Sequence, residues 1–157
     1  MAQLESLMKQ ITQYKNLFLD TNAIIYFLDD VPGYADLMEL ILNLAEQGQM
    51  SINLSVISEA ELLVKPYREG LLETVKAIKF WIEEFPNLQV IPVSREIAHK
   101  AADLRGKLRL RPPDALVLAT AINSNSEVIV GNDFEMLRKA AAYLPGIILQ
   151  NYVPNAQ

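Results

Sequence analysis

The chain has no cysteine and a single histidine, His99. Without cysteine it has no disulfide, no thiolate nucleophile and no cysteine-based zinc or iron–sulfur site. One histidine also argues against a Ser-His-Asp triad and against a metal site built from several imidazole groups. We expect His99 to lie on the surface of a helix. These absences exclude thiol chemistry and disfavour histidine-based catalysis.

Long apolar runs and an excess of basic residues are missing as well. No apolar run approaches the roughly 20 residues needed to span a bilayer, and the N-terminal MAQLESLMKQ lacks the apolar core of a signal peptide. We therefore expect a cytoplasmic protein. Nineteen acidic against fourteen basic residues give a net charge of −5, which argues against a broad basic nucleic-acid-binding face. A nucleic-acid enzyme stays possible, because bound metal can offset acids and basic residues can cluster locally.

Length and composition suit one folded unit. The 157 residues, of which 51% are hydrophobic, are enough for one buried core, and no repeat or long linker divides them. We therefore expect residues 1–157 to form a single domain.

Short apolar runs alternate with amphipathic patterns along the chain. The apolar runs predict β-strands at residues 17–20, 50–54, 88–92, 127–130 and 146–149. Apolar spacing and helix-boundary residues predict helices at residues 3–14, 34–47, 56–65, 69–84, 95–107, 114–123 and 134–143, and one directly after Asp20, with a break at Pro66. This order predicts a three-layer α/β/α fold: a doubly wound, mostly parallel five-stranded sheet with helices on both faces.

Acidic residues follow several of the predicted strands. In a doubly wound sheet, ligands bind outside the carboxyl ends of the strands, so acids at these ends are candidate site residues. Asp20 ends the first strand, and Glu59 and Glu61 lie in the helix after the second. Asp114 opens the helix after a pair of prolines, and Asp133 follows the fourth strand.

Each of these acids also has a structural explanation. Asp20 is a suitable cap for the helix that follows it. Ser58 and Glu61 fit the capping box S-x-x-E, and Asn132 with Glu135 mimics it. An acid just after a proline is a favourable charge at a helix N-terminus. Taken singly, each residue can be read either way.

Acids from four separate segments, all expected at one edge of the sheet, are harder to explain by capping. Two carboxylates about 4 Å apart repel each other by on the order of 4 kcal/mol at an effective dielectric near 20. A hard cation that prefers oxygen ligands, such as Mg²⁺ or Mn²⁺, would neutralise such a cluster. A metal with open positions can bind water and a substrate phosphate, which is the arrangement for metal-assisted phosphodiester cleavage.

Four sequence blocks resemble the PIN-domain family, in particular VapC-like toxins of bacterial toxin–antitoxin pairs. The blocks read FLDTNAIIYFL, SVISEAELL, PPDALVLATA and GNDF, and the likeness extends from about Leu17 to Leu149. They are similar to the family's Asp-Thr-Asn strand end, its Ala-Glu-Leu helix, its Asp before a small apolar helix, and its Thr-Asn-Asp turn. Residues 1–16 would be a helical extension before the usual start.

The resemblance implies that the metal-binding and catalytic acids are Asp20, Glu61, Asp114 and Asp133. It also implies a five-stranded parallel sheet, Mg²⁺- or Mn²⁺-dependent ribonuclease activity on RNA, a homodimer, and inhibition by a cognate antitoxin protein. Two departures stand out. Gly131 replaces the usual threonine, and GNDF lacks the last acid of the family's fourth block.

The basic segment RGKLRLR lies just before Asp114 and contains Arg105, Lys107, Arg109 and Arg111. It is either a loop that contacts phosphates locally or a solvated helix end, where cations are favourable. The sequence leaves both open.

We expect a metal-dependent endoribonuclease, against three alternatives. The same fold can serve as an interaction module with weak or no catalysis, and the departures in GNDF support that alternative. A haloacid-dehalogenase-type phosphatase needs a second aspartate two residues after the first, where this chain has Asn22. A receiver domain needs an aspartate after its third strand, and LQVIPVSRE has none.

Overall fold

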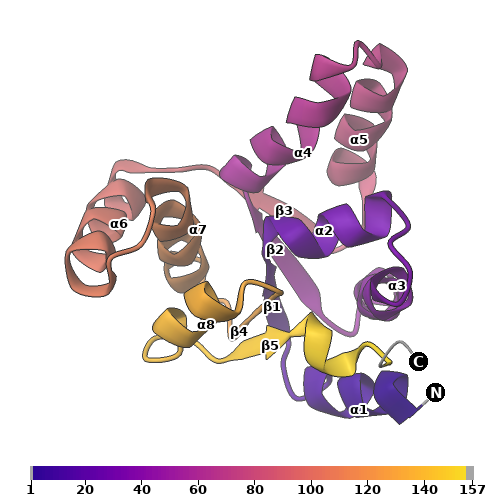
Figure 1. The fold of residues 1–157 in the computed structure, drawn as a ribbon, viewed down its shortest axis with the longest axis horizontal. Helices are drawn as coiled ribbons and strands as arrows, with labels where there is room; N and C mark the ends of the chain where they lie inside the picture. Colours follow the sequence, from indigo (N-terminus) through magenta and orange to yellow (C-terminus); the bar gives the residue numbers. More distant parts are fainter. Residues whose placement is uncertain (1, 155–157) are drawn as a thin grey trace.

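The computed structural model describes residues 2–154, and its centre is a five-stranded sheet (Figure 1). The strands are β1 (Asn16–Leu19), β2 (Ser51–Ser55), β3 (Leu88–Ile91), β4 (Val128–Gly131) and β5 (Gly146–Ile148). Every neighbouring pair is parallel, and the order across the sheet is β3-β2-β1-β4-β5. The central position of β1 places the residue after it in the middle of the sheet edge.

Helices connect the strands and cover both faces of the sheet. They are α1 (Ala2–Ile11), α2 (Thr21–Leu28), α3 (Tyr34–Glu46), α4 (Val56–Arg68), α5 (Leu72–Glu84), α6 (Arg95–Leu108), α7 (Pro112–Asn123), α8 (Phe134–Ala140) and the short 3₁₀ helix η1 (Leu149–Tyr152). The predicted three-layer, doubly wound α/β fold is confirmed.

Alternating side chains of the strands divide the interior into two cores. Leu17 and Leu19 of β1 face the core under α1, α2, α3 and α5, whereas Phe18 faces the core under α6, α7 and α8. Figure 1 shows the same division, with α6, α7 and α8 on one side of the sheet and α1 and α3 on the other. Because both faces are covered, the strands are apolar throughout.

The predicted helix break at Pro66 is wrong. Helix α4 continues through Pro66 to Arg68, and Pro66 itself is buried. A proline in a helix removes one backbone amide donor. The residues after Pro66 still make the hydrogen bonds that end the helix: Glu69 N donates to the carbonyl of Lys65 at 3.0 Å, and Leu71 N donates to that of Pro66 at 2.8 Å. The missing donor falls in the last turn, where its absence is tolerated.

Other boundaries differ from the predictions by a few residues. Helix α1 ends at Ile11 rather than residue 14, α7 begins at Pro112, and α8 ends at Ala140. A proline in the first helical turn fits without strain, which explains the earlier start of α7. The 3₁₀ helix η1 was not predicted. Within residues 2–154, the helices are too short or too polar to span a membrane.

Candidate active site at the carboxyl edge of the sheet

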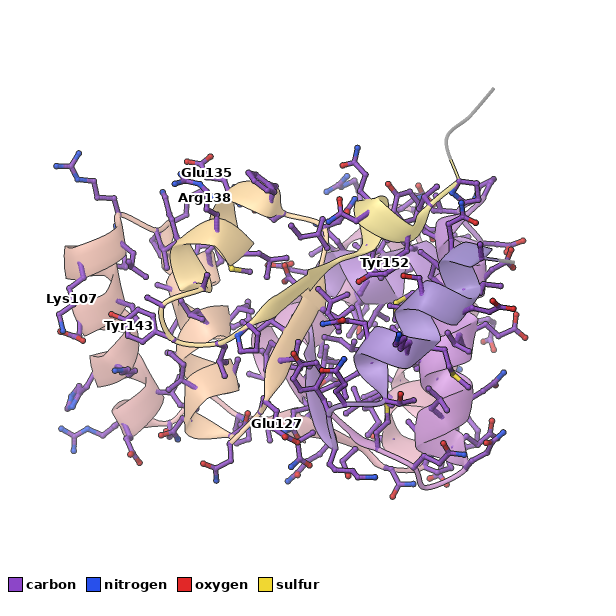
Figure 2. The ribbon with its side chains drawn as sticks, turned by 90° about the horizontal axis from the view of Figure 1, so that it is seen from below. Lys107, Glu127, Glu135, Arg138, Tyr143 and Tyr152 are labelled. Carbon is purple, nitrogen blue, oxygen red and sulfur yellow. The ribbon has the colours of Figure 1, made fainter. Side chains whose placement is uncertain are left out.

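Two of the four predicted acids follow adjacent central strands directly. Asp20 comes right after β1, and its amide donates to the Val130 carbonyl of β4 at 2.9 Å. Asp133 follows β4 by two residues. Because β1 and β4 are parallel neighbours, both aspartates lie at the same edge of the sheet. Figure 2 shows this edge where Glu135 and Arg138 of α8 lie, at the opposite end of the molecule from Glu127.

Both aspartates also cap helices. The Asp20 carboxylate accepts a hydrogen bond from Thr21 N at 2.8 Å at the start of α2. The Asp133 carboxylate accepts one from Met136 N at 3.1 Å at the start of α8. The expected cap at Asp20 is therefore confirmed, whereas Asn132 does not cap α8, because Asp133 does. The same two side chains therefore cap helices and belong to the group of acids.

The other two acids come from helices on either side. Glu61 is an exposed residue of α4, and Asp114 is the third residue of α7, with its side chain 23% exposed. The predicted capping box of Ser58 and Glu61 is wrong, because Ser55 caps α4 by accepting from Ile57 N at 3.1 Å. This leaves Glu61 with no capping role.

The electrostatics of Asp20 show that the four acids face one region. The pKa of Asp20 is raised from 3.8 to about 6, mainly by burial and in smaller part by the charges of Asp114, Glu61 and Asp133, against the lowering effect of the Thr21 amide. Like charges act this way only on a neighbour that they can reach. Asp20 therefore lies within electrostatic reach of the other three acids.

Arg111 is the cation that faces this cluster. Its Nε lies 3.0 Å from Oδ2 of Asp114, and this bond and charge raise the pKa of Arg111, with smaller contributions from Asp133 and Glu61. The other basic residues of this segment do not share one role in the structure. Lys107 pairs with Asp103 at 3.0 Å, on the side of α6 where Figure 2 shows it beside Tyr143.

A buried hydroxyl pair joins two of the elements that carry the acids. Oγ1 of Thr21 donates to Oγ of Ser58 at 2.7 Å, and both residues are buried. Thr21 follows Asp20 in the chain, and Ser58 lies one helical turn before Glu61. The hydrogen bond therefore fixes the start of α2 against α4 and, with it, the spacing of the two acids.

Two further contacts hold the turn after β4. A Cβ placed on Gly131 would lie 3.0 Å from Cβ of Asp20, so the position of the expected threonine is filled by the Asp20 side chain. Asn132 donates to the hydroxyl of Tyr26 at 3.0 Å and accepts from Gln150 N at 2.8 Å. Sequence reasoning missed the roles of Thr21, Tyr26 and Asn132, because these contacts link segments far apart in the chain.

Two cavities adjoin the acids. One of about 390 Å³ is lined by charged and apolar residues of the α6–α7 loop, α7 and α8: Arg109, Leu110, Arg111, Asp114, Asp133, Glu135, Met136 and Lys139. Another of about 270 Å³ lies among α2, α4 and α5 and includes Glu61 in its wall. The acids thus lie beside open space on both sides.

The donor set suits a hard cation, although its side chains are not gathered around one point. Among residues 2–154, no three His, Asp or Glu side chains are grouped as a metal site. Asp20 and Asp133 bind their own helix ends and Asp114 binds Arg111. Four carboxylates supply only oxygen ligands, as Mg²⁺ prefers, and their repulsion at Asp20 is what a cation would relieve. Arg111 occupies Oδ2 of Asp114, so a cation at this residue would share the carboxylate with Arg111 or displace it.

Comparisons with known proteins give one family and a set of similar folds. Residues 17–142 match the model of the PIN domain. A comparison with curated protein sequences gave no match. Among solved structures, the chain resembles VapBC2 from Rickettsia felis bound to a promoter DNA fragment, with 22% identity, a TM-score of 0.65, and coverage of 85% of this chain and 98% of that one.

Two more solved structures have the same fold. FitAcB from Neisseria gonorrhoeae has 19% identity and a TM-score of 0.63, over 85% of this chain and 98% of that one. VapBC-1 from nontypeable Haemophilus influenzae has 19% identity and a TM-score of 0.66, over 86% and 98%. The sheet order, the acids at its carboxyl edge and the match over most of the sequence lead to one conclusion: this chain belongs to the PIN domain family.

Proposed function

We propose that this protein is a Mg²⁺- or Mn²⁺-dependent endoribonuclease that acts as the toxin of a toxin–antitoxin pair. The observation that carries the nuclease part is that Asp20 follows the central strand β1 and that the charges of Asp114, Glu61 and Asp133 all raise its pKa. Such a cluster costs free energy unless a cation binds there. The toxin role is supported by the likeness to VapBC complexes and by membership of the PIN domain family.

The proposed metal ligands are Asp20, Glu61, Asp114 and Asp133. A bound divalent cation would lower the pKa of water and stabilise charge on the phosphate. The protein positions the carboxylates through β1, β4, α4 and α7, and the Thr21–Ser58 hydrogen bond ties α4 to the start of α2, directly after Asp20. A carboxylate of this cluster is proposed to orient the attacking water.

A protein partner is supported by exposed apolar side chains on the pair of helices α4 and α5. Val64, Tyr67, Leu71, Leu72 and Phe80 are each between 47% and 66% exposed. Figure 1 shows this helix pair extending away from the sheet. Exposed apolar patches commonly mark protein-binding surfaces, and we assign this one to the antitoxin. A homodimer and a cytoplasmic location complete the proposal and rest on the family resemblance.

The activity is tested by incubating the purified chain with RNA and Mn²⁺, beside Asp20→Asn. We expect cleavage by the natural chain and none by the variant, because the variant loses the central carboxylate but keeps an oxygen to cap α2. Asp30→Asn is the matched control, since Asp30 is exposed and its φ of 49° suits asparagine. Cleavage that survives Asp20→Asn would contradict the assignment, because it would come from a contaminating nuclease.

The second candidate is an interaction module with the same fold and little catalysis. It is favoured by the engagement of Asp114 with Arg111, which leaves the acids apart from one another. The two candidates differ in whether the protein binds a divalent cation. An enzyme should bind Mn²⁺ in calorimetry and lose that binding in Asp20→Asn, whereas a module should bind no Mn²⁺ and still bind its antitoxin.

A further inference from the structure

We propose that the 390 Å³ cavity beside Asp114 and Asp133 is a second phosphate site, which holds a phosphate of the RNA strand other than the one that is cut. This inference rests on the proposed ribonuclease function. It assigns roles to Arg109 and Lys139, which the acidic cluster does not use, and to the exposed ring of Phe134.

The cavity combines both signs of charge. Its wall contains the cationic Arg109, Arg111 and Lys139 together with two of the acids of the cluster, Asp114 and Asp133. In a chain with a net charge of −5, a polyanion needs a local concentration of cations to approach the acids. The cavity gathers three cations next to the proposed metal ligands, but with Glu135 it also holds three carboxylates, so a phosphate there depends on a cation that is not already paired.

Hydrogen bonds to backbone carbonyls hold the loop at Arg109, whereas its side chain makes no ion pair within residues 2–154. It has a left-handed backbone, with φ 55° and ψ 46°, at the C-terminal end of α6. Its carbonyl accepts from Lys139 Nζ at 3.5 Å, and the carbonyl of the next residue, Leu110, accepts from Arg105 Nε at 3.1 Å. Left-handed conformations of residues other than glycine often occur at functional sites.

The guanidinium of Arg109 has no carboxylate within 4.0 Å among residues 2–154, although it lines a cavity that contains three of them. By contrast, Lys107, two residues earlier, pairs with Asp103 and does not line the cavity. The planar donors of arginine match the oxygens of a phosphate. The structure therefore selects Arg109 over Lys107 as a phosphate ligand.

An exposed aromatic ring favours a nucleotide over a free phosphate. Phe134 is 63% exposed, follows Asp133 directly and is the first residue of α8. Exposed aromatic side chains beside a cationic groove stack on the bases of single-stranded nucleic acid. A phosphate on Arg109 and on Lys139, which would have to release its 3.5 Å ion pair with Glu135, together with a base on Phe134, would form one nucleotide next to the cleavage position.

The test measures binding of a fluorescein-labelled single-stranded RNA by fluorescence anisotropy over a KCl series, in the full chain carrying Asp20→Asn, so that RNA stays uncut. Removing a cation that binds one phosphate lowers the slope of log affinity against log salt by about 0.7. We expect this decrease for Arg109→Gln and for Lys139→Gln. We expect no change for the matched control Lys107→Gln, which removes the same charge outside the cavity.

Arg109→Lys keeps the charge and should retain the slope of log affinity against log salt. This variant therefore distinguishes the effect of the charge from an effect of local packing. Phe134→Ala should weaken binding by at least about fivefold and leave the slope unchanged, because stacking is not ionic. Equal slopes for Arg109→Gln, Lys139→Gln and Lys107→Gln, with unchanged melting temperatures, would overturn the phosphate site. Unchanged affinity in Phe134→Ala would overturn the stacking role.

The two proposals fail in different ways in these experiments. If the natural chain cleaves RNA and the cavity variants keep the parent slope, the ribonuclease stands and the second phosphate site is wrong. If the variants have a smaller slope and the natural chain does not cleave RNA, the site stands as a binding site and the ribonuclease proposal is wrong.

Discussion

At the scale of single residues, Asp20 meets two opposing requirements. It caps α2 through Thr21 N, which favours its charged form, while burial and three neighbouring acids favour its neutral form. The effects that favour the neutral form are larger, since the pKa rises from 3.8 to about 6. Such a group binds a proton more readily in the folded chain than in the unfolded chain.

The sign of this shift predicts how stability depends on pH without metal. The contribution of Asp20 is most favourable below about pH 4 and is lost as the pH rises through about 6, a loss on the order of 3 kcal/mol. Asp20→Asn should therefore match the natural chain near pH 4 and exceed its stability at pH 8. Urea unfolding in chelator at both pH values measures this, and a less stable variant at pH 8 would show that the charged cap outweighs the repulsion.

Arg111 competes with any cation for Asp114, because its guanidinium already lies 3.0 Å from that carboxylate. Removing this charge should strengthen Mn²⁺ binding. We expect Arg111→Gln to lower the dissociation constant for Mn²⁺ roughly three- to tenfold in calorimetry without RNA. Lys107→Gln is the control for a general loss of charge, and equal affinities in both variants would contradict the competition.

At the scale of elements, the start of α2 and the first turn of α4 are joined by one buried hydrogen bond, from Thr21 to Ser58. Ser58→Ala leaves a buried hydroxyl without its acceptor, which should lower the free energy of unfolding by about 1–3 kcal/mol. The double variant Thr21→Val with Ser58→Ala should regain part of that loss, since neither partner is left unpaired. Urea unfolding of the full mutant cycle measures the coupling, and strictly additive effects would contradict it.

The elements themselves were largely predictable from the sequence. Apolar strands and amphipathic helices signal their own positions, and all five strands occur within a residue or two of the predictions. The errors arise where local signals compete. Pro66 is a helix breaker in isolation, yet α4 accommodates it near its end, and Ser55 rather than Ser58 takes the cap. Only packing and backbone geometry decide between such alternatives.

The candidate site was predictable in part. The rule that ligands bind at strand ends and in the helix turns that follow gives Asp20, Asp114 and Asp133, whereas the choice of Glu61 over Glu59 comes from the family resemblance. The charges of Glu61, Asp114 and Asp133 all raise the pKa of Asp20. The bond of Arg111 to Asp114 and the contact of Gly131 with Asp20 could not be predicted. Both depend on how a loop and two strands meet in three dimensions, and neither leaves a pattern of spacing in the sequence.

At the scale of the whole molecule, helix α1 packs onto the PIN domain although it precedes the matched residues 17–142. Leu7 and Ile11 are fully buried, and α1 contacts both α3 and η1. Figure 2 shows Tyr152 of η1 on this side of the molecule. Helix α1 therefore closes one end of the larger core.

This packing gives α1 a measurable share in stability. Leu7→Ala should lower the free energy of unfolding by about 2–5 kcal/mol, because it creates a cavity among buried residues. Met8→Ala is the matched control, since Met8 is 39% exposed on the same helix and should change stability by less than about 1 kcal/mol. Equal values for the two variants in urea unfolding would mean that α1 is detached in solution.

The close approach of Gly131 to Asp20 has a consequence for how this sequence can change over time. A side chain at position 131 would begin 3.0 Å from Cβ of Asp20, so the two positions cannot vary independently. Because a change of rotamer does not move Cβ of Asp20, a threonine at position 131 would require a shift of a few tenths of an ångström between β1 and β4. A substitution at residue 131 therefore acts directly on the position of the proposed central ligand.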